Sequence, residues 1–302
     1  MMNPTATEPV PAPYKAISPL LEQFQSDLLV WGWMVTVLPL ICVIMAVRVT
    51  ISYENGRLFT SMDMQGMYLC IVLACVVVAL RAATPAAGAI GGVICLATTL
   101  ATTPDTHRIS QTCLTALLTL FVLTFTATRI GRKRKAMLGL AESHRGRAAR
   151  QIVANLGLAS LAALLHGMDY AMIVACIAAM AEATADTVSS ELGPLFPGST
   201  YLLTNFRRVA AGTDGGVSLG GTLCGIAAAG IVSIVGVRAV HFTWIEATTC
   251  FGASTLGFLF DSLLGATLER RGIIGNDMVN FLSTGMTCVL ALVFGVIFMP
   301  GY

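Results

Sequence analysis

One stretch of the chain, residues 182–225, combines acidic side chains, two arginines and a glycine-rich turn. Asp186 follows Glu182 by four residues, so both carboxylates would share one face of a helix near its end. The turn at 212–216 (GTDGG) would then expose backbone N–H groups at the start of the next helix. Carboxylates, guanidinium groups and such N–H groups are what a metal-bound phosphate ester needs. These residue types and their spacing therefore predict phosphate chemistry.

The basic pair and the turn are the candidates for holding phosphate. The pair lies between two acidic clusters and could clamp a phosphate, although basic residues next to a membrane segment also occur for topological reasons alone. Asp-Gly by itself is an ordinary turn signal, and the nearby Gly220, Gly221 and Gly225 are explained by helix packing. The predicted nucleotide- and phosphate-binding residues are Arg207, Arg208, Gly212, Thr213, Gly215, Gly216 and Ser218.

A second acidic position lies within an apolar stretch. Asp261 has no Lys or Arg within four residues along its own helix, which is costly inside a membrane segment unless the group has a function. In both acidic helices the aspartate is followed by Ser or Thr, and two such helices could hold one or two Mg²⁺ ions between them. The predicted catalytic residues are Asp186, Asp214 and Asp261, and the predicted metal ligands are these three with Glu191.

Further polar residues lie close to these positions along the chain. Asn155 follows Gln151 by four residues and could bond to a neighbouring helix or face the same cavity. Asn276 could be only a helix N-cap, with Asp277 favourable in the first turn. Glu182 could simply extend into the headgroup region. The further candidates are Glu182, Ser190, Asn155, Asn276, Asp277 and Asn280.

The elements that must position these residues are membrane helices. Of the 302 residues, 56% are hydrophobic and only 11% are charged, far below the roughly 25% charged of a soluble domain. Residues 1–27 are predicted to form a polar tail, and residues 28–302 a single all-α, polytopic membrane domain. With about 20 apolar residues needed per crossing, about nine spans are expected. They are 28–51, 65–81, 84–103, 109–129, 151–166, 169–190, 216–237, 242–267 and 277–299.

The distribution of Lys and Arg predicts the orientation. The segment 129–150 (RIGRKRKAMLGLAESHRGRAAR) is the dominant basic cluster and should be cytoplasmic. Counting spans from it places the N-terminus inside and the 187–215 loop on the same cytoplasmic face. Membrane topology already explains the basic cluster, so nucleic-acid binding is not expected.

Four motifs in order resemble a known family. They are ADTVSSELG, then RRVAAGTDGGVSLGGT, then DSLLGATL, then NDMVNFLS. Together they resemble the integral-membrane family, long of unknown function, that includes the animal transmembrane protein nineteen and the phytyl-phosphate kinase of plants and cyanobacteria. The resemblance covers about residues 65–290.

The resemblance implies an enzyme that phosphorylates an isoprenoid monophosphate with a nucleoside triphosphate, CTP being the first choice, and Mg²⁺. The expected partners are the nucleotide, a prenyl-phosphate lipid and the bilayer, with a homo-oligomer left open. The expected location is the cell inner membrane, with the active face cytoplasmic. An ion-coupled transporter or lipid flippase is the alternative, since intramembrane acids and glycine-broken helices suit it too.

Overall fold

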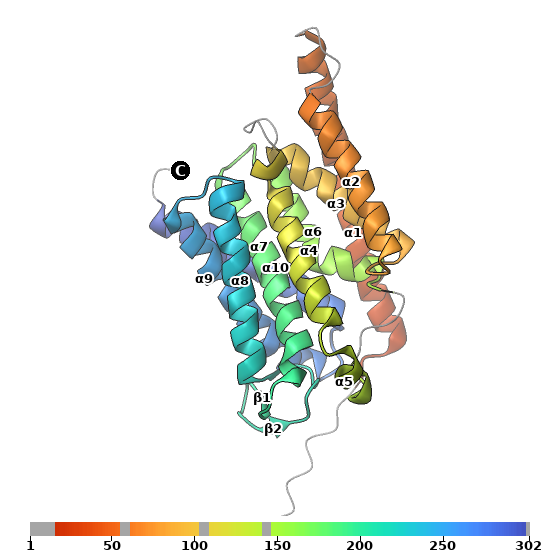
Figure 1. Ribbon diagram of the computed structural model, residues 1–302, viewed down its shortest axis with the longest axis vertical. Helices are drawn as coiled ribbons and strands as arrows, with labels where there is room; N and C mark the ends of the chain where they lie inside the picture. Colours follow the sequence, from red (N-terminus) through yellow and green to blue (C-terminus); the bar gives the residue numbers. More distant parts are fainter. Residues whose placement is uncertain (1–15, 55–60, 103–108, 141–145, 300–302) are drawn as a thin grey trace, which may run out of the picture.

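The chain folds into a bundle of α-helices with a small β-sheet at one end (Figure 1). The computed structural model describes residues 16–54, 61–102, 109–140 and 146–299. The α-helices are α1 (Pro19–Glu54), α2 (Ser61–Ala79), α3 (Pro85–Thr102), α4 (Cys113–Arg129), α5 (Arg132–Met137), α6 (Ala149–Leu165), α7 (Ala171–Leu192), α8 (Leu219–Ala239), α9 (Trp244–Leu264) and α10 (Asn276–Phe298). Short 3₁₀ turns lie at Ile109–Gln111 (η2) and Gly193–Leu195 (η3), and a π-helical turn at Gly265–Glu269 (η4).

The predicted polytopic, helical membrane architecture is confirmed in outline. Within the described residues, five helical segments are long and apolar enough to cross a membrane: Pro19–Ile51, Ala171–Leu195, Leu219–Ala239, Trp244–Glu269 and Asn276–Phe298. Four shorter apolar helices, of 10–17 residues, accompany them. Every range expected to span coincides with one helix, while the number of crossings and the side of the N-terminus stay predictions.

Helix α7 is the centre of the bundle. In its apolar window 83% of the residues are buried, against 22–39% in the other four candidate spans. It contacts α4, α6, α8, α9 and α10, and Figure 1 shows it between α4 and α8. Most of its buried side chains are small, mainly alanines, which allow neighbouring helices to approach closely. The acidic residues at its C-terminal end are therefore surrounded by other helices.

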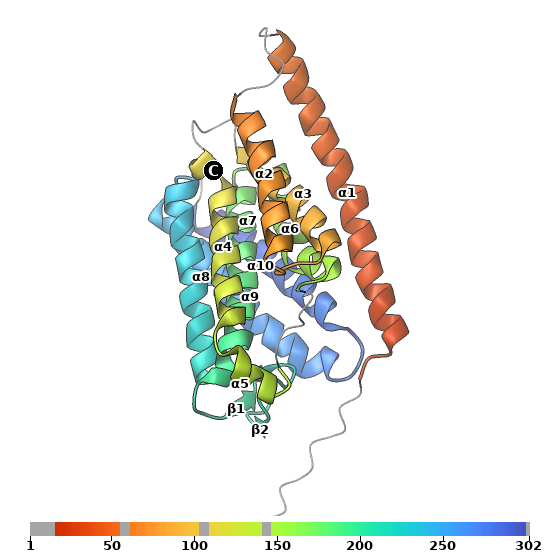
Figure 2. The same cartoon turned by 45° about the vertical axis from the view of Figure 1, so that its right-hand side comes forward.

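Helix α1 begins at Pro19, within the 1–27 segment predicted as a polar tail. The first turns of α1 are fastened to the start of α10. Ser26 Oγ donates to Asp277 Oδ2 at 2.8 Å, and the Gln25 amide bonds the backbone of Ile273 and Gly275 at 3.0 Å each. Figure 2 shows α1 running along the outside of the bundle. These contacts cross about 250 residues of chain, so local composition could not indicate them.

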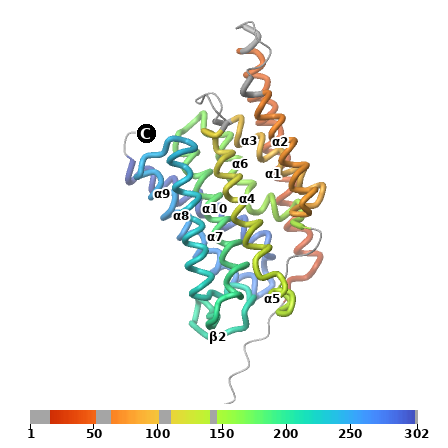
Figure 3. The backbone as a smooth tube through the Cα atoms, viewed as in Figure 1, coloured from red at the N-terminus to blue at the C-terminus, as the bar shows by residue number. Residues whose placement is uncertain are grey.

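A three-stranded antiparallel sheet departs from the all-α prediction. Its strands are β1 (Thr200–Leu202), β2 (Arg208–Val209) and β3 (Gly216–Val217), in the order β2-β1-β3. Tyr201 lies opposite Arg208 on one side and Val217 on the other. In Figure 3 the sheet, α5 and the start of α1 lie toward one end of the molecule and the C-terminus toward the other. The sheet folds the 193–218 connection back over the end of α7.

Candidate functional site

A polar pocket of about 190 Å³ lies where the C-terminal half of α7 meets the sheet and α9. It brings together Asp186 from α7, Asp214 from the turn between β2 and β3, and Asp261 from α9. The structure thus places side by side three aspartates that are far apart in the chain. The lining residues are Asp186, Ser189, Ser190, Gly193, Pro194, Thr200, Ala211, Gly212, Thr213, Asp214, Gly215, Gly216, Val217, Ser218, Phe258, Asp261, Ser262, Gly265, Glu269 and Asn276.

The glycine-rich turn forms one wall of this polar pocket. Gly212 and Gly215 have φ values of 82° and 67°, in the left-handed region that favours glycine. The turn is closed by the Gly216 N–H, which donates to Thr213 O at 2.8 Å. Helix α8 then starts at the same wall, and its N-cap Ser218 accepts a bond from the Gly221 N–H at 3.2 Å. A helix start beside a glycine turn favours an anion at this position.

The turn also packs tightly against the π-helical turn η4. A Cβ added at Gly215 would lie 2.0 Å from Ala266 N, and one added at Gly265 would lie 2.6 Å from Gly215 N. Neither contact involves a flexible side-chain end, so the backbone itself would have to move. Insertions of the π type are frequent at functional sites because they re-aim side chains. Here η4 carries Glu269 to the pocket.

We expect Gly215→Ala to lower the apparent unfolding temperature of the purified protein. The clash with Ala266 should destabilise it by about 1–3 kcal/mol, the usual range for an overpacked site. Gly139→Ala is the matched control, since Gly139 also has a left-handed φ of 72° but nothing lies within 4 Å of its added Cβ. Equal decreases of the unfolding temperature in the two variants would show that the close contact between Gly215 and η4 does not affect stability.

The pocket contains a concentration of negative charge. Asp261 lies within electrostatic range of Asp186, Glu182 and Glu269, and Glu269 in turn within range of Asp214. Asp261 Oδ2 and Glu182 Oε1 are buried and have no hydrogen-bond partner among the described residues. Buried carboxylate oxygens without partners are costly. This arrangement is suited to a cation that approaches from the pocket.

The donor set fits Mg²⁺ in one particular way. Among the described residues, no group of three or more His, Cys, Asp or Glu side chains is arranged to hold a metal ion alone. An all-protein cage is therefore not formed by these residues. Mg²⁺, however, is usually bound by one or two carboxylates together with substrate phosphates and water. Asp186, Asp214 and Asp261 around a phosphate-sized polar pocket match that second mode.

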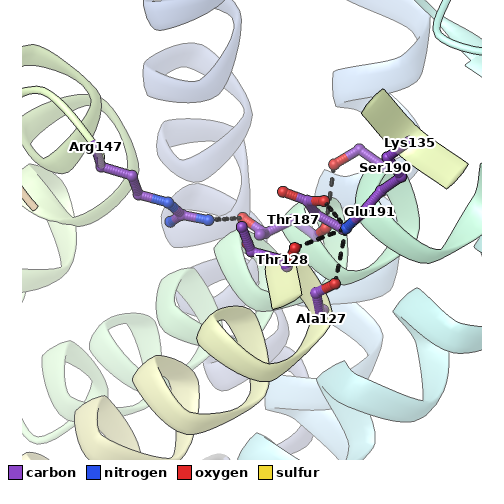
Figure 4. A network of polar contacts seen from close by, with 7 residues as sticks. All are labelled: Ala127, Thr128, Lys135, Arg147, Thr187, Ser190 and Glu191. Carbon is purple, nitrogen blue, oxygen red and sulfur yellow. Dashed lines mark hydrogen bonds and ion pairs between the residues drawn. The ribbon is translucent and has the colours of Figure 1, made fainter. Parts of the chain in front are cut away.

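Glu191, predicted as a metal ligand, is instead engaged by a buried lysine (Figure 4). Lys135 has 1% of its side chain exposed, and its ammonium group contacts the Glu191 carboxylate. The same ammonium group donates to Ala127 O at 3.0 Å and Thr128 O at 2.9 Å, at the end of α4. Glu191 is not among the described residues that line the polar pocket. Glu191 therefore attaches α5 to the end of α7 through its ion pair with Lys135.

The predicted phosphate clamps Arg207 and Arg208 are not brought to the pocket. Both side chains are exposed beside the sheet, and neither is among the described residues that line the pocket. Arg147 instead lies within electrostatic range of Asp186. Its guanidinium donates to Thr187 Oγ1 at 3.3 Å, as Figure 4 shows. In the sequence Arg147 was part of the basic cluster, and no local signal separated it from the other arginines.

The further candidates divide into two groups. Ser190 and Asn276 line the polar pocket. Glu182 is buried with 1% exposed, rather than extended toward headgroups, and packs against Gly257 of α9. Asp277 is paired with Arg150 at 3.2 Å, and Asn155 donates to Gln151 O of its own helix at 2.9 Å.

Two details of α10 complete this placement. Helix α10 has Gly275, not Asn276, as its N-cap. Asn280 is 8% exposed, and its backbone oxygen accepts from Ser283 Oγ at 3.0 Å. Glu182, Asn155, Asp277 and Asn280 are not among the described residues of the pocket wall.

Apart from glycines and apolar residues, the sequence interpretation missed four lining residues: Glu269, Ser189, Thr200 and Ser262. Glu269 ends the DSLLGATLE run, and its spacing of eight from Asp261 was a usable signal for a shared face. Ser189 is adjacent to Ser190 on α7, and the sequence alone could not show that both residues line the pocket. Thr200 enters through β1, which local pattern did not predict.

Comparison with known proteins places the chain in a family. A model of the family described as "Integral membrane protein DUF92" matches residues 68–288. An uncharacterised membrane protein of Methanocaldococcus jannaschii is 36% identical over 171 residues, which cover 56% of this chain and 70% of that protein. Protein VTE6, chloroplastic, of Arabidopsis thaliana is 30% identical over 183 residues, which cover 57% of this chain and 55% of that protein.

An uncharacterised membrane protein of Synechocystis is 30% identical over 188 residues, which cover 58% of this chain and 71% of that protein. The matched part thus spans about half the length of VTE6 and more of the other two relatives. No solved structure matches the chain. Since the family model extends over most of the sequence, this chain belongs to that family of integral membrane proteins.

Proposed function

We propose that this protein is a membrane-embedded lipid-phosphate kinase, which transfers a phosphoryl group from a nucleoside triphosphate to an isoprenoid monophosphate. The observation that carries the proposal is the convergence of Asp186, Asp214 and Asp261 on one polar pocket beside a glycine turn and a helix start. These are the parts that phosphoryl transfer uses to position phosphates and neutralise charge.

The choice of substrates is supported by similarity. The sequence motifs resemble the family of the phytyl-phosphate kinase, and VTE6 of the plant chloroplast is among the relatives. A prenyl or phytyl monophosphate is therefore the acceptor we propose, with CTP as the first donor to test. A lipid acceptor also gives a physical reason for embedding a kinase in the bilayer, because its apolar tail needs an apolar site.

The residues of the pocket divide the work of such a transfer. N–H groups of the 212–216 turn other than those of Thr213 and Gly216, which bond within the turn, and N–H groups of the first turn of α8 bind the triphosphate, where the helix dipole favours negative charge. Ser189 offers a hydroxyl donor, whereas the Ser190 hydroxyl donates to Thr187 O at 3.1 Å. A bound Mg²⁺, held by Asp186, Asp214 and Asp261, would neutralise charge on the transferred group. The acceptor is already ionised, so positioning rather than a strong general base is required.

We place the active face on the cytoplasmic side of the inner membrane. The basic helix α5 and the sheet lie toward the same end of the bundle, and clusters of Lys and Arg are normally retained in the cytoplasm. The alternative of an ion-coupled transporter expects its key acids near the bilayer midplane. The position of the polar pocket at the sheet end, past most of the length of α7, favours the kinase.

The decisive experiment uses the purified full chain in lipid nanodiscs with labelled CTP or ATP and a panel of prenyl monophosphates, with and without Mg²⁺. We expect Mg²⁺-dependent formation of the prenyl diphosphate. No labelled lipid product with any donor and acceptor, from protein that is folded by its unfolding transition, would refute the kinase proposal. Nucleotide-independent uptake of an ion by proteoliposomes would instead support the transporter.

A further inference from the structure

A second, larger cavity lies in the helix bundle. It has a volume of about 480 Å³ and lies between α2, α3, α4 and α6, and we call it the apolar cavity. Its walls are aliphatic and aromatic side chains, such as Leu73, Ile94, Leu120 and Phe121. Its size is within the range of about 300–1,000 Å³ that is usual for sites of small molecules.

Several arginine side chains line this cavity. Arg81, Arg129, Arg132 and Arg147 line it, and no Asp or Glu is among the described residues of its wall. Arg129 lies at the wall itself, since its guanidinium donates to Leu80 O at 2.9 Å and lies 4.6 Å from the ring centroid of Phe125. Guanidinium groups next to apolar surface favour an anionic partner, and phosphate suits their planar fork.

Arg147 lies between the apolar cavity and the residue next to Asp186 on α7. Its guanidinium donates to Thr187 Oγ1, the neighbour of Asp186, while the residue also lines the apolar cavity. Its backbone is locked against the loop after α2, with Arg147 N–H to Ala82 O and Thr84 N–H to Arg147 O at 3.0 Å each. Gly146 makes this close approach possible, because a Cβ there would lie 2.6 Å from the Ala82 carbonyl carbon. Arg81 and Arg147 are thereby held at one end of the cavity.

From this geometry we infer that the apolar cavity is the binding site of a lipid with one apolar chain and a phosphate monoester head. The chain lies between α2, α3, α4 and α6, and the phosphate lies on Arg81, Arg129 and Arg147. Arg147 is then a positioning residue, which holds the head toward Asp186. A free nucleotide would leave the apolar walls unused, and a neutral isoprenoid alcohol would leave the guanidinium groups without an anion.

This inference rests on the proposed function for the identity of the lipid, but its test does not require turnover. The measurement is equilibrium binding of labelled geranylgeranyl monophosphate to the full chain in neutral nanodiscs, without nucleotide or Mg²⁺. Gly91→Phe fills the cavity, because Gly91 lines it and nothing lies within 4 Å of its added Cβ. Gly32→Phe, at an exposed glycine of α1 with the same free space, is the matched control.

We expect Gly91→Phe to raise the Kd at least about tenfold and Gly32→Phe to leave it unchanged. In the wild type, geranylgeranyl monophosphate should bind more tightly than geranyl monophosphate, because each buried CH₂ contributes about 0.8 kcal/mol. This dependence on chain length should become weaker in Gly91→Phe. An unchanged Kd in Gly91→Phe would overturn the site.

The head group is tested through the arginines. Arg129→Gln and Arg81→Gln should each raise the Kd for geranylgeranyl monophosphate about tenfold or more. The weaker binding of geranylgeraniol should be unaffected. Arg238→Gln, an exposed arginine near the end of α8, should change neither. Loss of both ligands in equal measure would contradict phosphate recognition by these arginines. Displacement of the probe by phosphatidylglycerol at equal affinity would identify an ordinary bilayer-lipid site and also overturn the inference.

The two proposals fail separately. Binding with these variant effects but without turnover would sustain the lipid site and refute the kinase. Turnover that is insensitive to Gly91→Phe and Arg129→Gln would sustain the kinase and refute this site.

Discussion

Asp186→Asn and Asp214→Asn should each reduce phosphoryl transfer at least about a hundredfold while the protein stays folded. Both residues line the polar pocket, one from α7 and one from the glycine turn. An amide has nearly the shape of the carboxylate but lacks its charge, so it cannot neutralise a cation that bridges the phosphates. Loss of several kcal/mol of transition-state stabilisation corresponds to this reduction, since 1.36 kcal/mol is tenfold in rate.

The measurement is the rate of prenyl diphosphate formation under saturating nucleotide and over a range of Mg²⁺ concentrations. Asp169→Asn is the control: this exposed aspartate lies next to the opposite end of α7, where its Oδ1 accepts from the Ala171 N–H at 2.8 Å. An amide oxygen can accept the same bond, so the rate should not change. If both pocket variants retained the wild-type rate, the aspartates would have no part in the chemistry.

Lys135→Met should produce the largest loss of stability, about 3–5 kcal/mol in the free energy of unfolding. The substitution removes the partner of Glu191 and leaves a buried carboxylate without compensation. It also removes the donor to Ala127 O and Thr128 O, so α5 loses its attachment to the end of α4. A reduced rate of transfer should accompany this loss, because Glu191 is only five residues from Asp186.

Denaturant-induced unfolding of Lys135→Met, Glu191→Leu and the double variant Lys135→Met/Glu191→Leu measures the coupling free energy between the two residues. The double variant should recover much of the loss, because apolar residues of similar volume avoid the unpaired charge. Lys133→Met is the control, since Lys133 is exposed on the same short helix. A double variant as unstable as the sum of the two single variants would show that Lys135 and Glu191 act independently.

The contrast between Glu191 and Asp186 illustrates the limit of reasoning along one helix. Both are acidic residues near the end of α7, and both were predicted as metal ligands from the sequence ADTVSSE. Five residues correspond to about 500° of helix rotation, so their side chains emerge about 140° apart. Asp186 therefore faces α9 and the glycine turn, whereas Glu191 faces α4 and α5, where Lys135 meets it (Figure 4).

The amino-acid sequence by itself indicated the membrane class and the approximate ranges of the long helices, and it singled out the three aspartates that the structure brings to one pocket. Apolar runs of the length of a bilayer core can be recognised locally, and an acid such as Asp261 within such a run is too costly to be accidental. The glycine turn was equally visible, because Asp-Gly and Gly-Gly favour backbone conformations that other residues avoid.

Only the tertiary structure decided which charged groups meet. Lys135 and Glu191 are 56 positions apart, Ser26 and Asp277 are 251 apart, and strands of two or three residues pair only because the helices bring them together. Arg147, rather than Arg207 or Arg208, lies near Asp186 and bonds to the adjacent Thr187, because the loop after α2 holds its backbone there. Charge interactions depend on distance and burial in space, and neither quantity is contained in the local order of residues.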